Sequence, residues 1–299
     1  MKWQLTLLIL LAFVMSFPVS AQEMPDQIRQ KIEKHGIGEW IDTRSLDGEE
    51  TIALTRRTWS KDKQVFLMEC VTAQGRDYEV GYWNGNEFVS QGHSTSGDNW
   101  VIKYDTFGED AWTGHGSGMQ GGTWKEWDST IKFVDDGFRY EEATDEYELV
   151  IVGQRQFAKS SKDAAKAFGD FMVGGVWTTV DGDGNTKKHA YGWMYGRQFF
   201  NMTPIIDPEP GSSFHGFDPI SGFYRIWGFN MNGFMGATGM QVSKNEWIFV
   251  AQFQTEIGLV QGRATFEATD ENTLTINAQA TIDGEPQEPT VTVWHRVQQ

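Results

Sequence analysis

The 299-residue sequence is poor in cysteine and in basic residues, and each shortage excludes a class of protein. Cys70 is the only cysteine, so the chain cannot form an internal disulfide. It lies in an apolar run at 66–71, which predicts a buried thiol. Carboxylates outnumber Lys and Arg by 41 to 25, giving a net charge of −16. A surface this acidic repels nucleic acid and anionic lipid headgroups, so we expect neither as a partner.

Motifs for metal binding, phosphate binding and hydrolysis are also scarce. The six histidines lack the tight spacing of zinc ligands, and neither a nucleophile elbow nor a phosphate-binding glycine loop is present. Asp181, Asp183 and Asn185 have the one-three-five spacing of a calcium loop. However, Gly192 stands where such a loop needs a bidentate Glu, and a glycine-rich hairpin accounts for the same residues. The sequence therefore predicts no catalytic residue, no metal and no cofactor.

Long apolar runs are missing after residue 21, so no later segment is expected to span a membrane. Before that point, Lys2 is followed by an apolar segment at 5–14 and by small residues ending at Ala21. This arrangement predicts a signal peptide at 1–21, with the mature protein exported to the periplasm or the cell exterior. An uncleaved anchor is the alternative, although the apolar segment is shorter than the ~20 residues of a spanning helix.

Glycine and aromatic residues are abundant, with 33 Gly, 13 Trp and 14% aromatic residues overall. This composition suits short strands, tight turns and aromatic-filled interiors. Alternating segments separated by turns run through most of the chain, whereas helical patterns are confined to 25–35 and 164–171. The length suits two domains, which we place at 22–158 and 159–299.

Both halves begin with the same motif. A Gly-x-Trp at 38–40 and another at 175–177 each follow a short helical segment and open a series of alternating strands. One arginine stands near the end of each half, Arg155 in the first and Arg296 in the second. These matches favour an internal duplication. Weaker matches join 56–68 with 190–202 and Trp100 with Trp247.

The tryptophans and the late arginines are expected to meet. Closing an antiparallel sheet places its first and last strands side by side. A tryptophan of the first strand then faces an arginine of the last, in a cation–π contact of roughly 0.5–2 kcal/mol. We therefore pair Trp40 with Arg155 and Trp177 with Arg296, each pair sealing one end of a barrel. The motif glycine is expected to allow a sharp turn across the barrel floor.

A Gly-x-Trp after a short helix, followed by many antiparallel strands and a late arginine, resembles the lipocalin-like, or calycin, barrels. The second half resembles secreted bacterial lipocalin-like domains of unknown function, through 193–199 and 217–222. The first half has a glycine-rich insert at 114–122, which the sequence leaves open as a bulged strand or a loop. The resemblance implies a mainly β fold of two tandem antiparallel barrels, each preceded by a short helix. It also implies that a barrel interior can hold one apolar ligand.

Aromatic residues of the second half recur with period two, which directs one set into the barrel. We place a small apolar or aromatic ligand there, bound without catalysis. Apolar side chains would supply buried area, and Tyr191 and His215 would supply polar selectivity. The predicted contacts are Tyr191, Trp193, Phe200, Phe214, His215, Trp227 and Trp247.

Three alternatives to this interpretation stay open. One is a haem held through His215 or His295. Another is a structural or protein-binding module with filled barrels, which predicts an exposed apolar patch. The third is an enzyme with its site in the second barrel, which requires facing carboxylate and histidine side chains.

Overall fold

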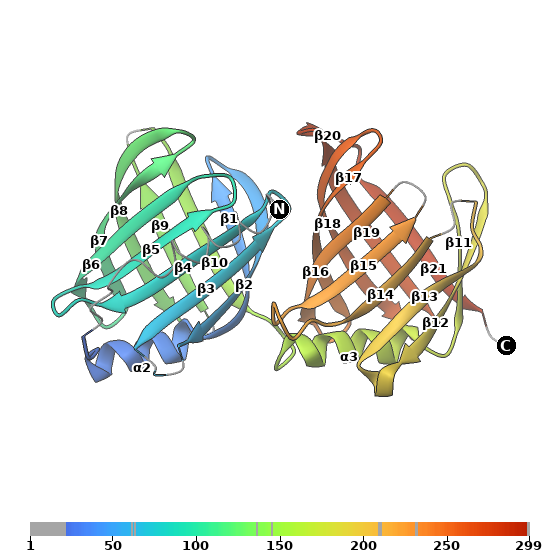
Figure 1. The fold of residues 1–299 in the computed structure, drawn as a ribbon, viewed down its shortest axis with the longest axis horizontal. Coiled ribbons are helices and arrows are strands. Elements are labelled where there is room, and N and C mark those ends of the chain that lie inside the picture. Colours follow the sequence, from blue (N-terminus) through green and yellow to red (C-terminus); the bar gives the residue numbers. More distant parts are fainter. Residues whose placement is uncertain are drawn as a thin grey trace, which may run out of the picture.

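The computed structural model describes residues 22–60, 62, 64–135, 137–144, 146–208, 211–230 and 233–297. The predicted signal peptide at 1–21 lies outside them. The described residues form two closed antiparallel barrels of ten strands each, in tandem, so the predicted mainly β class is confirmed (Figure 1). Neither helix in this part of the chain has the length and apolar character needed to cross a membrane.

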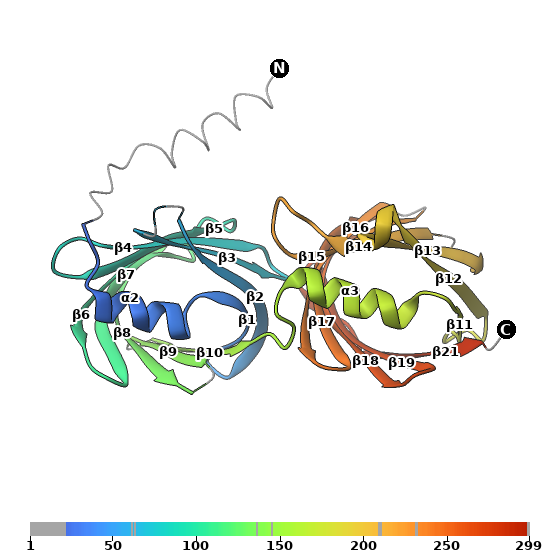
Figure 2. The ribbon, with the colours of Figure 1, turned by 90° about the horizontal axis from the view of Figure 1, so that it is seen from below.

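Helix α2 (Asp26–His35) lies across one end of the first barrel (Figure 2). Its Ile28 and Ile32 are one helical turn apart, so both are buried against the aromatic residues of the strands. The strands are neighbours in sequence order, and the first closes the barrel by pairing with the tenth. They are β1 (Gly38–Leu46), β2 (Glu49–Trp59), β3 (Val65–Thr72), β4 (Arg76–Trp83), β5 (Phe88–Ser94), β6 (Asn99–Phe107), β7 (Ala111–Gln120), β8 (Thr123–Val134), β9 (Gly137–Ala143) and β10 (Glu148–Arg155).

Helix α3 (Ser161–Met172) holds the same place in the second barrel. Ser160 caps it by accepting a hydrogen bond from the backbone N–H of Asp163 at 3.2 Å. Ten strands form the ring, with β20 (Glu285–Pro286) paired beside it and a 3₁₀ turn, η1 (Tyr195–Arg197), after the second. The ring consists of β11 (Val176–Val180), β12 (Thr186–Met194), β13 (Phe199–Ile206), β14 (Gly211–Phe217), β15 (Tyr224–Asn230), β16 (Gly233–Ser243), β17 (Glu246–Thr255), β18 (Gly258–Asp270), β19 (Thr273–Ile282) and β21 (Thr290–Val297).

The two Gly-x-Trp motifs occupy equivalent places in their barrels. Trp40 and Trp177 are 1% and 0% exposed, and each lies opposite the late arginine of its own barrel in the strand register. The Arg155 guanidinium lies 4.4 Å from the centroid of the Trp40 ring, and that of Arg296 lies 4.8 Å from Trp177. The register of the first and last strands therefore brings each indole to the guanidinium expected from the sequence.

The same residues attach each helix to its barrel. The Trp40 Nε1 donates to the Gly36 carbonyl at 2.8 Å, and Arg155 donates to the carbonyls of Lys34 and Ile37. A cation at the C-terminal end of a helix is also favoured by the helix dipole. The second barrel repeats the arrangement with Trp177 bonded to Met172 and Arg296 bonded to Phe171.

The late arginine packs so closely against the first residue of the Gly-x-Trp motif that this position must be glycine in both barrels. A Cβ at Gly38 would lie 2.4 Å from Nη1 of Arg155, and one at Gly175 would lie 2.8 Å from Cγ of Arg296. Gly38 has a positive φ of 130°, whereas in the second barrel the positive φ falls on Gly174, at 89°. The chain therefore turns between helix and first strand in both barrels, but the glycine with positive φ is Gly38 in the first and Gly174 in the second.

The weaker sequence matches have mixed outcomes. Residues 56–68 and 190–202 both fall on the second and third strands of their barrels. Trp100 lies on the sixth strand of its barrel and Trp247 on the seventh, so aligning these two residues is wrong. The glycine-rich segment at 114–122 is mostly a regular strand, β7, rather than a loop.

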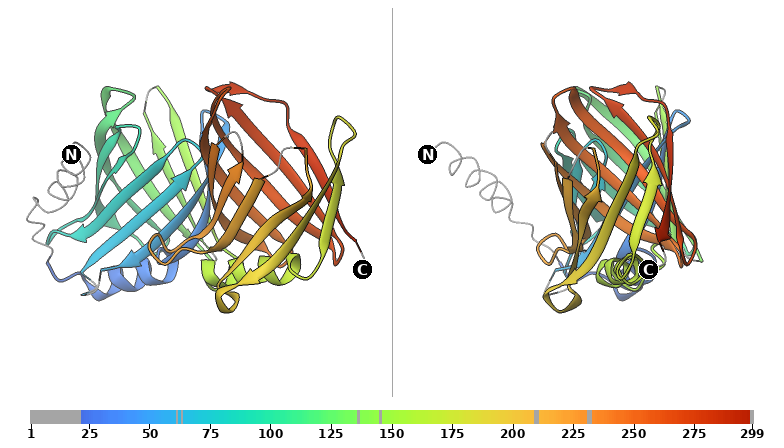
Figure 3. Two further views of the ribbon diagram at one scale, coloured as in Figure 1. Left: turned by 45° about the vertical axis from the view of Figure 1, so that its right-hand side comes forward. Right: turned by 90° about the vertical axis from the view of Figure 1, so that its right-hand side faces the viewer.

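The barrels lie side by side with both helices at the same end (Figures 1 and 3). Outward-facing apolar residues of the two barrels form a shared cluster, in which Leu54, Phe223 and Met240 are all 0% exposed. The linker adds a backbone hydrogen bond from Phe157 to the Gln241 carbonyl at 2.8 Å. Buried apolar residues therefore form three clusters, one in each barrel and one between them.

Candidate functional site

A cavity of about 940 Å³ occupies the interior of the first barrel. It runs from helix α2 to the loops at the opposite end, and this volume is within the roughly 300–1,000 Å³ of small-molecule sites. Helix α2 and the surrounding strands supply an apolar floor. The floor consists of Ile32, Phe66, Phe88, Trp112, Ile131, Phe133 and Phe138.

Glycines on the inner face of the barrel keep this interior open. An added Cβ at Gly92 would lie 2.4 Å from the Trp100 ring, and one at Gly116 would lie 2.2 Å from the Trp127 ring. Each glycine is the register partner of that tryptophan on the adjacent strand. The indoles therefore lie against the barrel wall, over the glycines, and leave the centre free.

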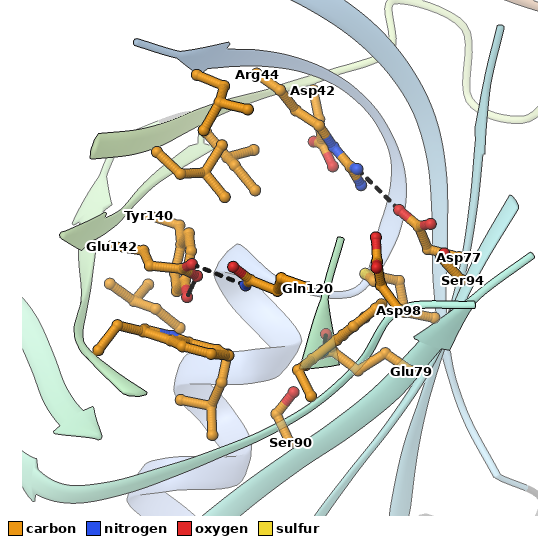
Figure 4. Close-up of a pocket in the computed structure, with 18 of the residues that line it drawn as sticks. Asp42, Arg44, Asp77, Glu79, Ser90, Ser94, Asp98, Gln120, Tyr140 and Glu142 are labelled. Carbon is orange, nitrogen blue, oxygen red and sulfur yellow. Dashed lines mark hydrogen bonds and ion pairs between the residues drawn. The ribbon is translucent and has the colours of Figure 1, made fainter. Parts of the chain in front are cut away.

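Two ion pairs face the cavity above its floor. The Asp42 carboxylate, which is 1% exposed, accepts from Nη2 of Arg57 at 2.8 Å and from Oγ1 of Thr55 at 2.6 Å. Arg44 donates to Oδ2 of Asp77 at 2.8 Å (Figure 4). Alternation places Asp42 and Arg44 on the same inner face of β1, because residues two apart in a strand point the same way.

A carboxylate with neutral partners lies on another part of the wall. Glu142 is 4% exposed and accepts from the Tyr140 hydroxyl at 2.6 Å, from Nε2 of Gln120 at 3.2 Å and from the Tyr147 hydroxyl. Burial, assisted by the nearby Glu142 charge, raises the pKa of Tyr140 well above its ordinary value. Both tyrosines therefore stay protonated and keep donating to this carboxylate.

Several buried polar atoms at the cavity have no hydrogen-bond partner in the described part of the chain. They include Oγ of Ser90, Nε1 of Trp127 and Nη1 of Arg57. Leaving such a group unsatisfied costs about 1–3 kcal/mol. All three atoms are buried, so water or a ligand can hydrogen-bond to them only if neighbouring side chains move.

The single cysteine lies beside this site without being reactive. Cys70 is 0% exposed, so the buried thiol predicted from its apolar run is confirmed. Nη2 of Arg44 donates to its Sγ at 2.8 Å. Burial nevertheless raises the pKa of Cys70 to about 12, so the sulfur stays a neutral thiol at physiological pH.

The seven residues predicted to contact a ligand lie in the second barrel, apart from this cavity. Five of them, namely Tyr191, Trp193, Phe200, His215 and Trp247, face inward. They surround Phe168 of α3, whose ring lies 5.0 Å from Trp247, 6.1 Å from Phe200 and 6.2 Å from His215. Phe214 and Trp227 alternate with inward residues and lie on the outer face, where Phe214 is 36% exposed.

His215 is a hydrogen-bonded core residue. Its Nε2 lies 2.8 Å from Oγ of Ser213 and its Nδ1 lies 3.3 Å from the Tyr224 hydroxyl, so both ring nitrogens have partners. The other histidine considered for haem, His295, is exposed. In the calcium-like loop, Oδ1 of Asp181 accepts two backbone N–H groups of its own hairpin. Within the described residues, no three His, Cys, Asp or Glu side chains are grouped to hold a metal ion.

Acid is expected to destabilise the second barrel through His215. Burial lowers the pKa of His215 to about 3, whereas an unfolded histidine titrates near 6.5. The unfolded chain therefore takes up a proton that the folded chain rejects, and stability falls as the pH drops from 6.5 towards 3. Urea unfolding should show a loss of about 2 kcal/mol between pH 7 and pH 5 from this group.

Two variants check the assignment to His215. His215→Gln should lose less stability between pH 7 and pH 5 than the wild type, whereas His115→Gln, at an exposed histidine, should behave like the wild type. Equal losses in the wild type and His215→Gln would contradict the buried neutral imidazole.

The cavity of the first barrel was not predicted from the sequence. Its signal is nevertheless present in the alternation of Gly114, Gly116 and Gly118 along β7, all of which face inward. Inward positions without a side chain allow close approach of the next strand and let a ring lie against the wall, as Trp127 does over Gly116. The polar inner face of β1 is a second signal for the same barrel.

No protein-family model and no curated protein matches the chain. Among solved structures, it is similar to a protein of unknown function from the DUF3598 family of Nostoc punctiforme, with 9% identity over 92% of this chain and 100% of that one and a TM-score of 0.29. It is also similar to a mutant of transferrin binding protein B from Haemophilus parasuis, with 7% identity over 84% of this chain and 66% of that one and a TM-score of 0.21. At these scores neither likeness carries an argument about function. The chain's own fold and site define it as a tandem antiparallel β-barrel protein with a large cavity in the first barrel.

Proposed function

We propose that the first barrel binds one small amphipathic molecule in its cavity. The observation that carries this proposal is the cavity of about 940 Å³, with an apolar floor and charged walls. The apolar part of the ligand would lie against α2 and the aromatic floor, where buried area contributes about 25 cal/mol per Å². The polar part would face the ion pairs and carboxylates of the wall, which select among ligands.

The lipocalin-like resemblance and the predicted export support the same function. Lipocalin-like barrels are expected to enclose one small ligand. The signal peptide predicted at 1–21 fits a binding protein that meets its ligand in the periplasm or outside the cell. In the second barrel, Phe168 already packs against the inward aromatic residues. We therefore assign the ligand to the first barrel and a structural role to the second.

Protein binding is a second candidate function, favoured by an aromatic patch on the outer face of the second barrel. Phe214, Phe229 and Phe234 are 36%, 50% and 51% exposed. Their rings are in mutual contact, with centroids 6.3 Å apart for Phe214 and Phe229 and 5.3 Å apart for Phe229 and Phe234. Contiguous exposed apolar surface is typical of interaction sites. This patch is separate from the cavity, so the two functions are compatible.

Filling the cavity is expected to displace the ligand. Ser90 faces the cavity and is 3% exposed, so Ser90→Phe places a ring inside it. Native mass spectrometry of protein purified from its host should show a bound small-molecule mass on the wild type. The variant should retain about tenfold less, a loss of about 1.4 kcal/mol in binding free energy.

The neighbouring residue provides a matched control. Gln91 follows Ser90 on β5 and faces outward, so Gln91→Phe adds the same ring outside the cavity and should leave the bound mass unchanged. Absence of any bound mass on wild-type protein, or equal retention by both variants, would contradict ligand binding in this cavity.

A further inference from the structure

Negative charge dominates the cavity of the first barrel. Among the residues that the structure describes, seven carboxylates and four Arg or Lys side chains line it, a net charge of −3. The whole chain has the same sign, with a net charge of −16. A cleft lined by one sign of charge raises the local concentration of oppositely charged ligands. The cavity therefore attracts cations and repels anions.

The cationic side chains at the cavity already have carboxylate partners. Arg57 is paired with Asp42 and Arg44 with Asp77, each at 2.8 Å. Lys125 is paired with a carboxylate at the mouth at 3.3 Å. An anionic ligand would have to compete for the paired groups of Arg44, Arg57 and Lys125, because the unpaired Nη1 of Arg57 is buried. Breaking a buried ion pair leaves an uncompensated charge at a cost of about 3–5 kcal/mol.

Two carboxylates of the wall, by contrast, have neutral partners. Glu79 accepts a hydrogen bond from Nε1 of Trp100 at 3.2 Å, and Glu142 accepts from two tyrosines and a glutamine. Across the described residues, neither has an Arg, Lys or His side chain at ion-pair distance. Glu142 is buried and Glu79 is half-buried. A buried carboxylate without a cation is costly, and a cationic ligand would supply the missing partner.

Aromatic side chains lie between these two carboxylates. Figure 4 shows Glu142 beside Tyr140 on one wall and Glu79 on the opposite wall. Trp100 and Trp127 lie against the glycines of the wall, which turns their faces towards the centre. Tyr104 also lines the cavity, and burial raises its pKa well above the ordinary value, so it stays a neutral ring. Aromatic faces attract cations by about 0.5–2 kcal/mol, so these rings add to the attraction of the two carboxylates.

We infer that the ligand of the first barrel is an amphipathic organic cation, an amine or quaternary ammonium compound, whose charged group lies between Glu79 and Glu142. This inference rests on the proposed function of the cavity and adds the chemical class of its ligand. The apolar part of the ligand extends towards α2, and the ammonium group takes the place of the cation that both carboxylates lack. The cavity selects positive charge because its Arg and Lys side chains are already paired with carboxylates and are not free to bind an anion.

Three probes with one chain length and different head groups test the class of ligand. Decyltrimethylammonium, decanol and decanoate are titrated into the full mature chain at pH 7, at concentrations below micelle formation, and followed by isothermal titration calorimetry. We expect the ammonium compound to bind at least about tenfold more tightly than decanol, and decanoate to bind most weakly.

Variants at the two carboxylates locate the charged group. Glu79→Gln and Glu142→Gln keep the side-chain shape and one acceptor oxygen and remove the charge. Each should therefore weaken binding of decyltrimethylammonium about tenfold and leave decanol unchanged. Glu141→Gln is the matched control, because Glu141 is next to Glu142 on β9, faces outward and is paired with Lys132 at 2.7 Å. Circular dichroism melting checks that each variant is folded.

The outcomes separate this inference from the function on which it rests. Equal affinities for the three probes, or the tightest binding for decanoate, would overturn the cationic class and leave small-molecule binding in place. If Glu141→Gln and Glu142→Gln weakened binding of decyltrimethylammonium equally, the assigned position of the charged group between Glu79 and Glu142 would be wrong. Binding of none of the three probes, together with no effect of Ser90→Phe on the retained mass, would overturn the proposed function itself.

Discussion

Trp177→Ala is expected to lower the free energy of unfolding of the second barrel by about 3–5 kcal/mol. The side chain is 0% exposed, and its ring lies 5.1 Å from Phe171 of α3. Truncation also removes the hydrogen bond from Nε1 to Met172 and the surface on which Arg296 stacks. The loss therefore combines a cavity, an unsatisfied carbonyl and a weakened attachment of the helix.

Scanning calorimetry measures this effect barrel by barrel, since two domains need not unfold in a single transition. The control is Trp124→Ala, which removes the same side chain at a site that is 59% exposed and should change stability by less than about 0.5 kcal/mol. Trp177→Phe should lie between them, because it keeps ring packing and loses the N–H donor. Similar shifts for Trp177→Ala and Trp124→Ala would show that the indole does not seal the barrel.

The placement of Trp40 and Trp177 follows from sequence because closure of a sheet is a geometric constraint. First and last strands must be neighbours, so a tryptophan early in each half has few partners available. Alternation also separates inward from outward residues along each strand. The predicted ligand contacts neglect this constraint at Phe214, which lies on the outer face, whereas its neighbour His215 faces inward. These constraints operate on the backbone and do not depend on how side chains fill the interior.

Which barrel is hollow depends instead on side-chain volume across many strands. Helix α3 inserts Phe168 among the aromatic residues of its barrel, whereas α2 presents the smaller Ile28 and Ile32 to its own. Gly92 and Gly116 then let the rings of Trp100 and Trp127 lie against the wall of the first barrel. Aromatic content alone therefore points to the wrong barrel as the hollow one, because an inward ring can either fill the centre or lie against the wall.

The ion pairs of the cavity are beyond sequence reasoning for a related reason. Arg44 and Asp77 are 33 residues apart, and they meet because β1 to β4 are neighbours in a closed ring. Asp42 and Arg57 meet because of the register between β1 and β2. A shift of one residue would turn the side chains of one strand to the opposite face and separate the pair. The sequence shows that these residues are polar positions within strands. Which of them form ion pairs depends on the strand register, which the sequence does not give.

Arg57→Met is expected to destabilise the first barrel by about 3–5 kcal/mol, because it leaves the Asp42 carboxylate as a buried charge without a counter-ion. Asp42 is 1% exposed, and Thr55 is the remaining donor to its Oδ2. The arginine also stacks on Phe138, with its guanidinium 4.5 Å from the ring centroid, and methionine retains much of that packing. The loss is thus expected to come mainly from charge.

A double-mutant cycle tests whether charge is the cause. Asp42→Asn combined with Arg57→Met removes both charges, so the double variant should be more stable than Arg57→Met alone, with an interaction energy of about 0.5–3 kcal/mol. Chemical denaturation of the four proteins measures it, and additive losses would mean that packing, not charge, dominates. Recovery of stability in the double variant would show that Arg57 serves to neutralise Asp42 within the barrel. Asp42 would then not need a cationic ligand, and Glu79 and Glu142 would be the carboxylates that bind one.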